Sequence, residues 1–225
     1  MKKLFFVLLA LCLSFSTGGN VFASATEDSE GEAVSAYYIK NGEKIYIPKE
    51  DFVELFNQNS VYELPGDTSV EKNQGTTITP YANVCVPGYE YDARLMSGAF
   101  ENHHSGTRQA NKTSGPIGWT STVTKGFDIN PSVSATGGFD WKVIEAEVGF
   151  NISATWSWQT SEAVQVSIPV NRMGWNDFGS YREQWTGTHY YLTGSCGKSN
   201  QVTVTPKGSK YKLNVARESA IPPGV

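Results

Sequence analysis

The stretch IEAEVGFNISATWSW, residues 144–158, alternates between apolar and polar residues over its whole length. Its even positions, from Ile144 to Trp158, are all apolar, and its odd positions are charged, polar or glycine. Successive side chains of a β-strand point to opposite faces, so this period of two predicts a strand with one apolar and one polar face. Globular strands usually have about five or six residues. We therefore expect an unusually long two-faced strand, which Gly149 breaks or bulges.

The same alternation continues upstream with the opposite phase. Odd positions are apolar from Phe127 to Val143, and the phase changes between Val143 and Ile144, which marks a bulge or a bend. Short alternating segments separated by glycine-rich and polar turns fill residues 81–216, without the rhythm of strand, helix and strand. We expect an all-β, antiparallel sandwich or elongated pair of sheets here, followed by a loose tail at 217–225.

The first residues have the pattern of a signal peptide. Lys2 and Lys3 precede an apolar run from Leu4 to Phe15, which is too short to span a membrane. The small residues Ala23-Ser24-Ala25 follow, so we expect cleavage after residue 25, with Ala23 as the alternative. The sequence therefore predicts a secreted, extracellular protein.

Residues 26–64 are predicted to form an acidic N-terminal appendage. Asn41-Gly42 lies between two alternating segments, which indicates a β-hairpin, and residues 50–57 favour a short helix. Residues 65–80 have the composition of a linker. Two interpretations remain: the appendage permanently caps a sheet edge, or it is a pro-segment that is removed by cleavage in the linker.

Two cysteines, Cys85 and Cys196, remain after removal of the signal peptide. In an oxidising exterior the simpler expectation is one disulfide between them, and the alternative is two free thiols. A bridge would join the start of the main domain to its second-last strands. Closure of so long a loop contributes about 4–5 kcal/mol in the chain-entropy model.

Charge and motifs exclude several functions. The chain has a net charge of −4 and no clustered basic face, so we expect no nucleic-acid partner. The adjacent His103 and His104 would point to opposite sides of a strand, and with His189 they make a poor metal site. The Gly197–Ser199 triplet lacks the leading glycine of a phosphate-binding loop. We expect neither a metal nor a cofactor.

No catalytic residues are predicted. Glu145 and Glu147 would share one strand face about 7 Å apart, which is one requirement of a glycosidase, but nothing else in the sequence supports that interpretation and a solvated sheet face explains them better. A cysteine in a disulfide cannot act as a nucleophile. A non-enzymatic protein is expected, and a hydrolase with an unrecognised site is the third choice.

The segment WTSTVTKGFDINPSVSATGGFDWKVIEAEVGFNISATWSWQTSEAVQVSIPV, within residues 117–170, resembles the insertion region of aerolysin-like β-pore-forming proteins, including the epsilon-toxin/Mtx2-type branch. In that family a two-faced hairpin joins others in a transmembrane barrel after oligomerisation. The chain also looks like small secreted β proteins of Gram-positive bacteria. It departs from the family in its short length and in lacking an obvious receptor-binding domain.

The resemblance implies a homo-oligomer that acts on a lipid membrane. The lipid-facing residues would be Ile144, Val148, Phe150 and Ile152, with Trp156 and Trp158 at the interface. The same apolar face is also compatible with a strand buried in a sandwich. The competing function is a monomeric binding module that uses exposed aromatics on cell-envelope glycans or proteins. Trp156, Trp158 and Trp175 are its candidate binding residues.

Overall fold

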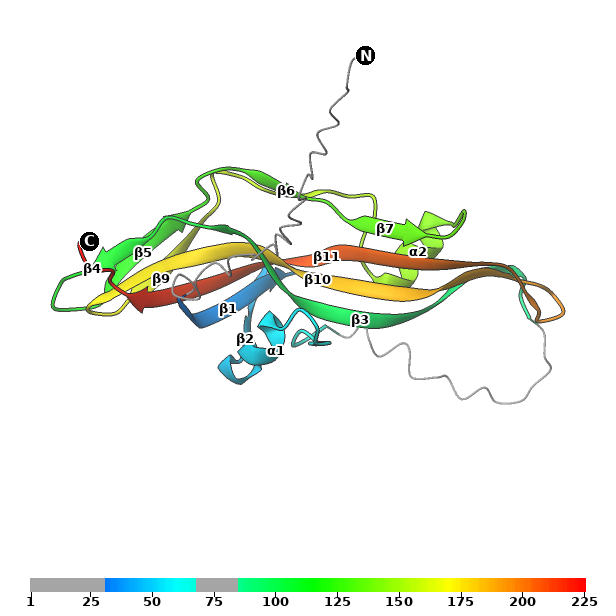
Figure 1. Ribbon diagram of the computed structural model, residues 1–225, viewed down its shortest axis with the longest axis horizontal. Helices are drawn as coiled ribbons and strands as arrows, with labels where there is room; N and C mark the ends of the chain where they lie inside the picture. Colours follow the sequence, from blue (N-terminus) through cyan, green and yellow to red (C-terminus); the bar gives the residue numbers. More distant parts are fainter. Residues whose placement is uncertain (1–30, 68–84) are drawn as a thin grey trace, which may run out of the picture. The chain divides into compact units, whose positions relative to one another are not determined.

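The computed structural model describes residues 31–67 and 85–225, and residues 31–225 form one compact unit. The signal-peptide prediction for 1–25 and most of the predicted linker lie outside the described residues. The fold is all-β and antiparallel, as the alternation predicts (Figure 1). Within the described residues no helix is long and apolar enough to cross a membrane.

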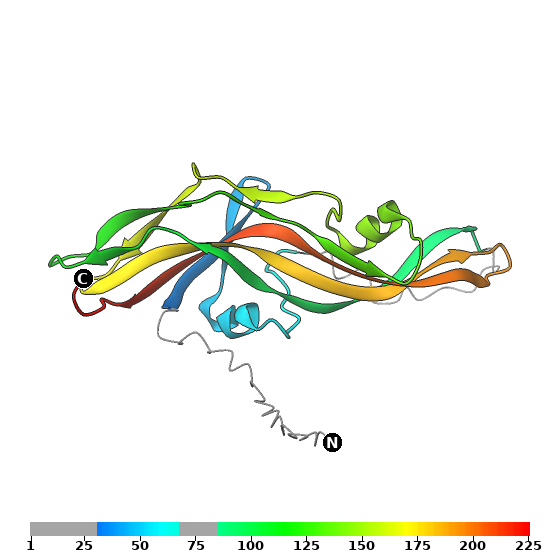
Figure 2. The same cartoon turned by 45° about the horizontal axis from the view of Figure 1, so that its top comes forward.

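Three long strands run side by side along the unit (Figures 1 and 2). They are β3 (Gly88–Ser105), β10 (Arg172–Leu192) and β11 (Lys198–Ala220), and β10 lies between the other two. Two short strands join this sheet, since β4 (Gln109–Asn111) pairs with the start of β10 and β7 (Ser132–Ala135) pairs with β11. β11 continues four residues into the segment that we expected to be loose.

The N-terminal appendage belongs to the sheet. The predicted hairpin is β1 (Glu32–Lys40) and β2 (Glu43–Ile47), with positive φ angles at Asn41 and Gly42. β1 pairs with the C-terminal half of β11, and the short helices η2 (Lys49–Asp51) and α1 (Phe52–Phe56) follow. The appendage therefore covers the outer edge of β11 and is continuous with the main core.

Between β4 and β10 the chain makes a long excursion. It contains β5 (Ile117–Thr122), β6 (Phe127–Ile129), α2 (Trp141–Val148), β8 (Trp156–Trp158) and β9 (Ala163–Ile168), besides β7. β5 pairs with β9, and β6 pairs with β8. In both views α1 and α2 lie on opposite sides of the long strands (Figures 1 and 2).

The core consists of separate clusters along the sheet. Phe52 and Leu55 of α1 pack against Tyr181 and Leu213 on one side. On the other side α2 and the chain after it pack against β3, β10 and β11, and β6 and β8 form a third cluster around Phe178. Burial of apolar surface thus attaches each side element to the long strands.

The long strand predicted for Ile144–Trp158 does not form, and this prediction is wrong. Residues 141–148 are helical, and only Trp156–Trp158 of the stretch is a strand. The Asp140 carboxylate accepts the backbone N–H of Lys142 at 2.9 Å, which caps the helix, and Gly149 ends it in the left-handed conformation. Ile144 and Val148 are four residues apart, so their spacing suits a helix as well as a strand.

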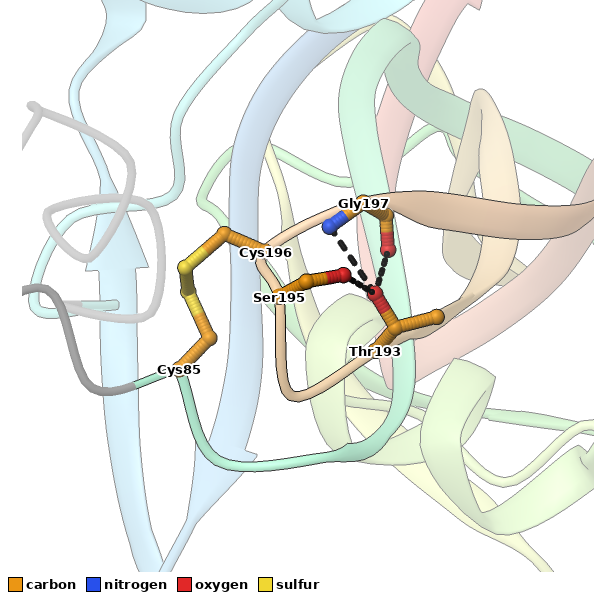
Figure 3. Close-up of a disulfide and its surroundings, with 5 residues drawn as sticks. All are labelled: Cys85, Thr193, Ser195, Cys196 and Gly197. Atoms are coloured by element: carbon orange, nitrogen blue, oxygen red, sulfur yellow. Dashed lines mark hydrogen bonds between the residues drawn. A yellow bond between two sulfur atoms is a disulfide. The ribbon is translucent and has the colours of Figure 1, made fainter.

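The predicted disulfide between Cys85 and Cys196 is present (Figure 3). It joins the residues before β3 to the turn between β10 and β11. The Thr193 hydroxyl donates to the Gly197 carbonyl at 3.1 Å and accepts the Gly197 N–H at 3.0 Å, so the turn has its own hydrogen bonds (Figure 3). The bridge fixes one end of the three long strands.

Reduction of this disulfide should lower the free energy of unfolding by about 4–5 kcal/mol in the chain-entropy model, because the unfolded chain regains the entropy of a 111-residue separation. Urea denaturation with and without reductant measures the change. The double variant Cys85→Ser/Cys196→Ser is the control, and it should not respond to reductant. A wild-type midpoint that reductant leaves unchanged would contradict the prediction.

Candidate functional site: a docked two-faced hairpin

The excursion between β4 and β10 leaves and returns at the same point. Asn111 pairs with Arg172, and the Asn171 N–H donates to the Asn111 carbonyl at 2.9 Å. The buried Asn111 side-chain amide also donates to the carbonyls of Ile168 and Gly115, both at 2.9 Å. One buried side chain therefore holds both ends of residues 112–171 together.

The two arms of the excursion keep one register. Ile117 faces Ile168 and Thr122 faces Ala163 in the first paired region, and Phe127 faces Trp158 in the second. The two residue numbers of every pair add up to 285 in both regions. The Val123 N–H donates to the Glu162 carbonyl at 3.1 Å between them, in the same register. The arms are thus one interrupted hairpin, which we call the docked hairpin.

After a hydrogen bond from the Thr155 hydroxyl to the Asn130 side chain at 2.8 Å, the arms separate and attach to the long sheet instead. β7 pairs with β11, from Ser132 opposite Lys207 to Ala135 opposite Val204. The chain then turns at Gly137 and Gly138 and enters α2. The outer part of the docked hairpin is therefore held by the sheet and not by its own partner arm.

The apolar side chains of this outer part are buried against the sheet. The four candidate insertion residues share one cluster with Tyr91, Trp185 and Val204, and each is at most 6% exposed: Ile144, Val148, Phe150 and Ile152. Phe150 lies directly over Gly208 of β11, where an added Cβ atom would be 2.3 Å from its ring. The absence of a side chain at Gly208 makes room for Phe150.

A buried ion cluster lies next to Phe150 in β10 and β11. Lys210 forms ion pairs with Glu183 at 3.0 Å and with Asp67 at 2.9 Å. The second Glu183 oxygen accepts the indole N–H of Trp185 at 2.8 Å. Burial raises the pKa of Glu183, and Lys210 opposes that shift. The cluster ties Asp67, three residues beyond the appendage, to the strands beneath the docked hairpin.

The remaining contacts of the docked hairpin are the apolar cluster around Phe178 and several polar contacts. Lys212 of β11 pairs with Glu162 at 2.7 Å and lies 4.6 Å from the centre of the Trp158 ring. Arg182 donates to the Asn130 carbonyl at 3.1 Å. The Lys212–Glu162 pair is partly exposed, so it contributes little to stability. Apolar packing therefore provides most of the attachment.

The three tryptophans expected to bind a ligand have different environments. Trp158 is buried against Phe178, and Trp156 is partly buried beside it. Trp175 lies in β10, and it is 1% exposed. Its indole N–H donates to Asp177 at 2.9 Å, and Arg108 stacks on its ring. Trp175 is therefore a core residue of the sheet.

The residues considered for catalysis and metal binding remain apart. Glu145 accepts the Ile152 N–H at 3.0 Å, which supports the end of α2, and Glu147 belongs to the same helix instead of a strand face. Among the described residues no group of three or more His, Cys, Asp or Glu is placed to hold a metal ion. The interrupted hairpin is the feature that sequence reasoning missed, although the phase change at residues 143–144 marks its middle.

Comparisons of the chain with protein-family models, with curated proteins and with solved structures find no match. The functional argument therefore depends on the geometry of this chain.

Substitution of Gly208 by alanine should loosen the docked hairpin, because the new methyl group displaces Phe150. We expect a loss of about 1–3 kcal/mol in stability, with faster hydrogen exchange at residues 149–158. Mass spectrometry of exchanged peptides measures the local effect.

Gly138→Ala is the matched control, since no atom lies within 4 Å of an added Cβ atom there. It should leave exchange at 149–158 unchanged. Equal protection of these residues in the two variants would count against a role for the Phe150–Gly208 contact.

Proposed function

We propose that the protein acts on membranes: the docked hairpin leaves the sheet, extends in its existing register and inserts into the bilayer as part of a homo-oligomer. The constant register of the two arms carries this proposal. If the same register continues beyond the Ile129–Trp156 pair, the turn between the two arms falls at Lys142 and Val143. The alternation of apolar and polar residues changes phase at the same place. The residue pairs that exist in the docked form would then keep their partners in the extended form.

In this extended form the two faces have opposite character. Residues directly opposite each other in antiparallel strands lie on the same face. Odd positions of the first arm therefore share a face with even positions of the second. Between the Phe127–Trp158 pair and the turn, every residue of this face is apolar, glycine or proline: Phe127, Ile129, Pro131, Val133, Ala135, Gly137, Phe139, Trp141, Ile144, Ala146, Val148, Phe150, Ile152, Ala154, Trp156 and Trp158.

The opposite face is polar over the same length. Apart from Val143 at the turn, its residues are polar, charged or glycine: Asp128, Asn130, Ser132, Ser134, Thr136, Gly138, Asp140, Lys142, Glu145, Glu147, Gly149, Asn151, Ser153, Thr155 and Ser157. A membrane-spanning strand needs one face for lipid and one for water. The sequence meets this requirement in both arms.

The length also fits a bilayer. Eleven residues, 128–138, lie between Phe127 and Phe139 in the first arm. A membrane-spanning β-strand has about 9–11 residues, and aromatic side chains flank its lipid-facing band. Phe127, Trp156 and Trp158 would lie at one interface, and Phe139 and Trp141 at the other.

Extension requires α2 to become a strand. The helix has eight residues, and its apolar positions Ile144 and Val148 fit either structure. The cost of exposing the buried face is offset only if lipid replaces the sheet as its partner. The protein would therefore keep its hairpin docked in water.

Oligomerisation has a candidate surface in β3. This 18-residue strand is at the edge of the sheet, and the described backbone bonds to its outer side come from Ser60 and Tyr62 at Gly98. Unpaired strand edges favour pairing with another chain. A binding module built on Trp158 and Trp175 has less support, because both side chains are buried.

A disulfide between β7 and β11 should block membrane activity. Ser134 and Thr205 are paired neighbours, so the variant Ser134→Cys/Thr205→Cys links the hairpin to the sheet. We expect dye release from lipid vesicles to fall at least about tenfold and to return on reduction. Wild-type protein with the same reductant controls for the native disulfide.

The matched control is Thr120→Cys/Gln165→Cys, which links the two arms of the docked hairpin to each other. It preserves the proposed register and should retain dye release. A Ser134–Thr205 link that releases dye as well as the wild type would refute the insertion of this hairpin.

A second cross-link tests the extended register itself. Ser134 pairs with Thr205 in the docked form, but its partner in the extended hairpin is Asn151. The variant Ser134→Cys/Asn151→Cys should therefore form its new disulfide far more efficiently with vesicles present. Mass spectrometry of the linked peptides measures the yield, and equal yields with and without vesicles would contradict the proposed extension.

A further inference from the structure

A hollow of about 390 Å³ lies where the start of α2 meets the end of the long sheet. Tyr89 of β3 and His189 of β10 form one wall, and Phe139, Asp140 and Trp141 of the docked hairpin form the other. The hollow is therefore complete only while the hairpin is docked.

Aromatic rings make up most of both walls. The rings of Tyr89 and His189 are stacked with their centres 5.2 Å apart, and those of Phe139 and Trp141 are 4.7 Å apart. Tyr89 is 51% exposed and Trp141 is 48% exposed, although both are large apolar side chains that usually pack in the interior. Their exposure beside a hollow leaves ring faces available to a ligand.

The charge of the hollow is negative. Asp140 is the only carboxylate that lines it, and no lysine or arginine does so among the described residues. Burial lowers the pKa of His189, which disfavours a positive charge on this ring, and its Nε2 accepts the Asp140 N–H at 3.4 Å. A second hollow that is also lined by Tyr89 contains the carboxylates of Glu90, Asp92 and Glu147, while Lys142 lines it and Lys198 pairs with Asp92 at 3.4 Å.

From the rings and the charge we propose that this hollow binds a quaternary ammonium group of the choline type. Aromatic faces attract such cations through the ring quadrupole, and their methyl groups need no hydrogen-bond partners. A carboxylate at the rim adds attraction for a cation and repels anions such as sulfate or phosphate. The site stands independently of hairpin insertion, because it belongs to the docked form in water.

Titration calorimetry of the full chain with choline chloride, against sodium chloride at equal ionic strength, tests the site. We expect saturable binding in the millimolar range for wild type and a loss of most of that binding in Trp141→Ala. Choline should also raise the melting temperature, since it binds the docked form.

Asp140→Asn removes the negative charge but keeps the N-cap of α2, because asparagine also caps a helix. It should weaken choline binding several-fold and leave the helix intact. Tyr46→Ala is the control, as Tyr46 is 60% exposed on β2 and is not a lining residue of the hollow. Equal binding by wild type and Trp141→Ala, or tighter binding of glucose than of choline, would overturn the proposal.

The quaternary ammonium group can come from a lipid headgroup or from a soluble ligand, and a further experiment distinguishes these two sources. Cosedimentation with phosphatidylcholine vesicles that free choline displaces assigns a lipid headgroup. Binding of free choline without cosedimentation assigns a soluble ligand. Both results support the site, and neither depends on dye release, so failure of the hairpin proposal would be recognised separately.

Discussion

The pairing of β10 with β11 is the interaction on which the rest of the structure depends. It extends from Arg172 opposite Ala220 to Leu192 opposite Lys198, and a short turn connects the two strands. Every other strand of the large sheet is attached to one of these two, directly or through β1. Because this pair is joined locally, its formation costs less loop entropy than the pairing of β1 or β3.

Under the proposed function, the apolar face of the hairpin between β4 and β10 would be covered by different partners in water and in a bilayer. In water it must be covered, and Trp185, Val204 and Gly208 of the sheet cover it. In a bilayer lipid would cover it instead. The alternating pattern also places Ile144 and Val148 about one helical turn apart. Part of this face can therefore be buried as the helix α2, while the strand pairs of the hairpin keep their register.

The sequence predicts the class of the fold, the hairpin at Asn41-Gly42 and the disulfide between Cys85 and Cys196. These depend on local signals or on the small number of cysteines. It does not predict α2, although Asp140 and Gly149 are caps that the alternation of residues 144–158 obscures. The burial of Trp175 depends on a partner far along the chain, Arg108, whose guanidinium group lies over the indole ring, so the local sequence is a poor guide.

The shared anchor at Asn111 has a consequence for the architecture. Residues 112–171 begin and end beside each other, at a point where β4 and β10 are already antiparallel neighbours. Topologically they are an insertion in an ordinary hairpin loop, and a tight turn is enough to reconnect the two strands. The strand order β2-β1-β11-β10-β3 is therefore built entirely from residues outside the insertion, whereas the burial of Trp185, Val204 and Phe178 depends on it.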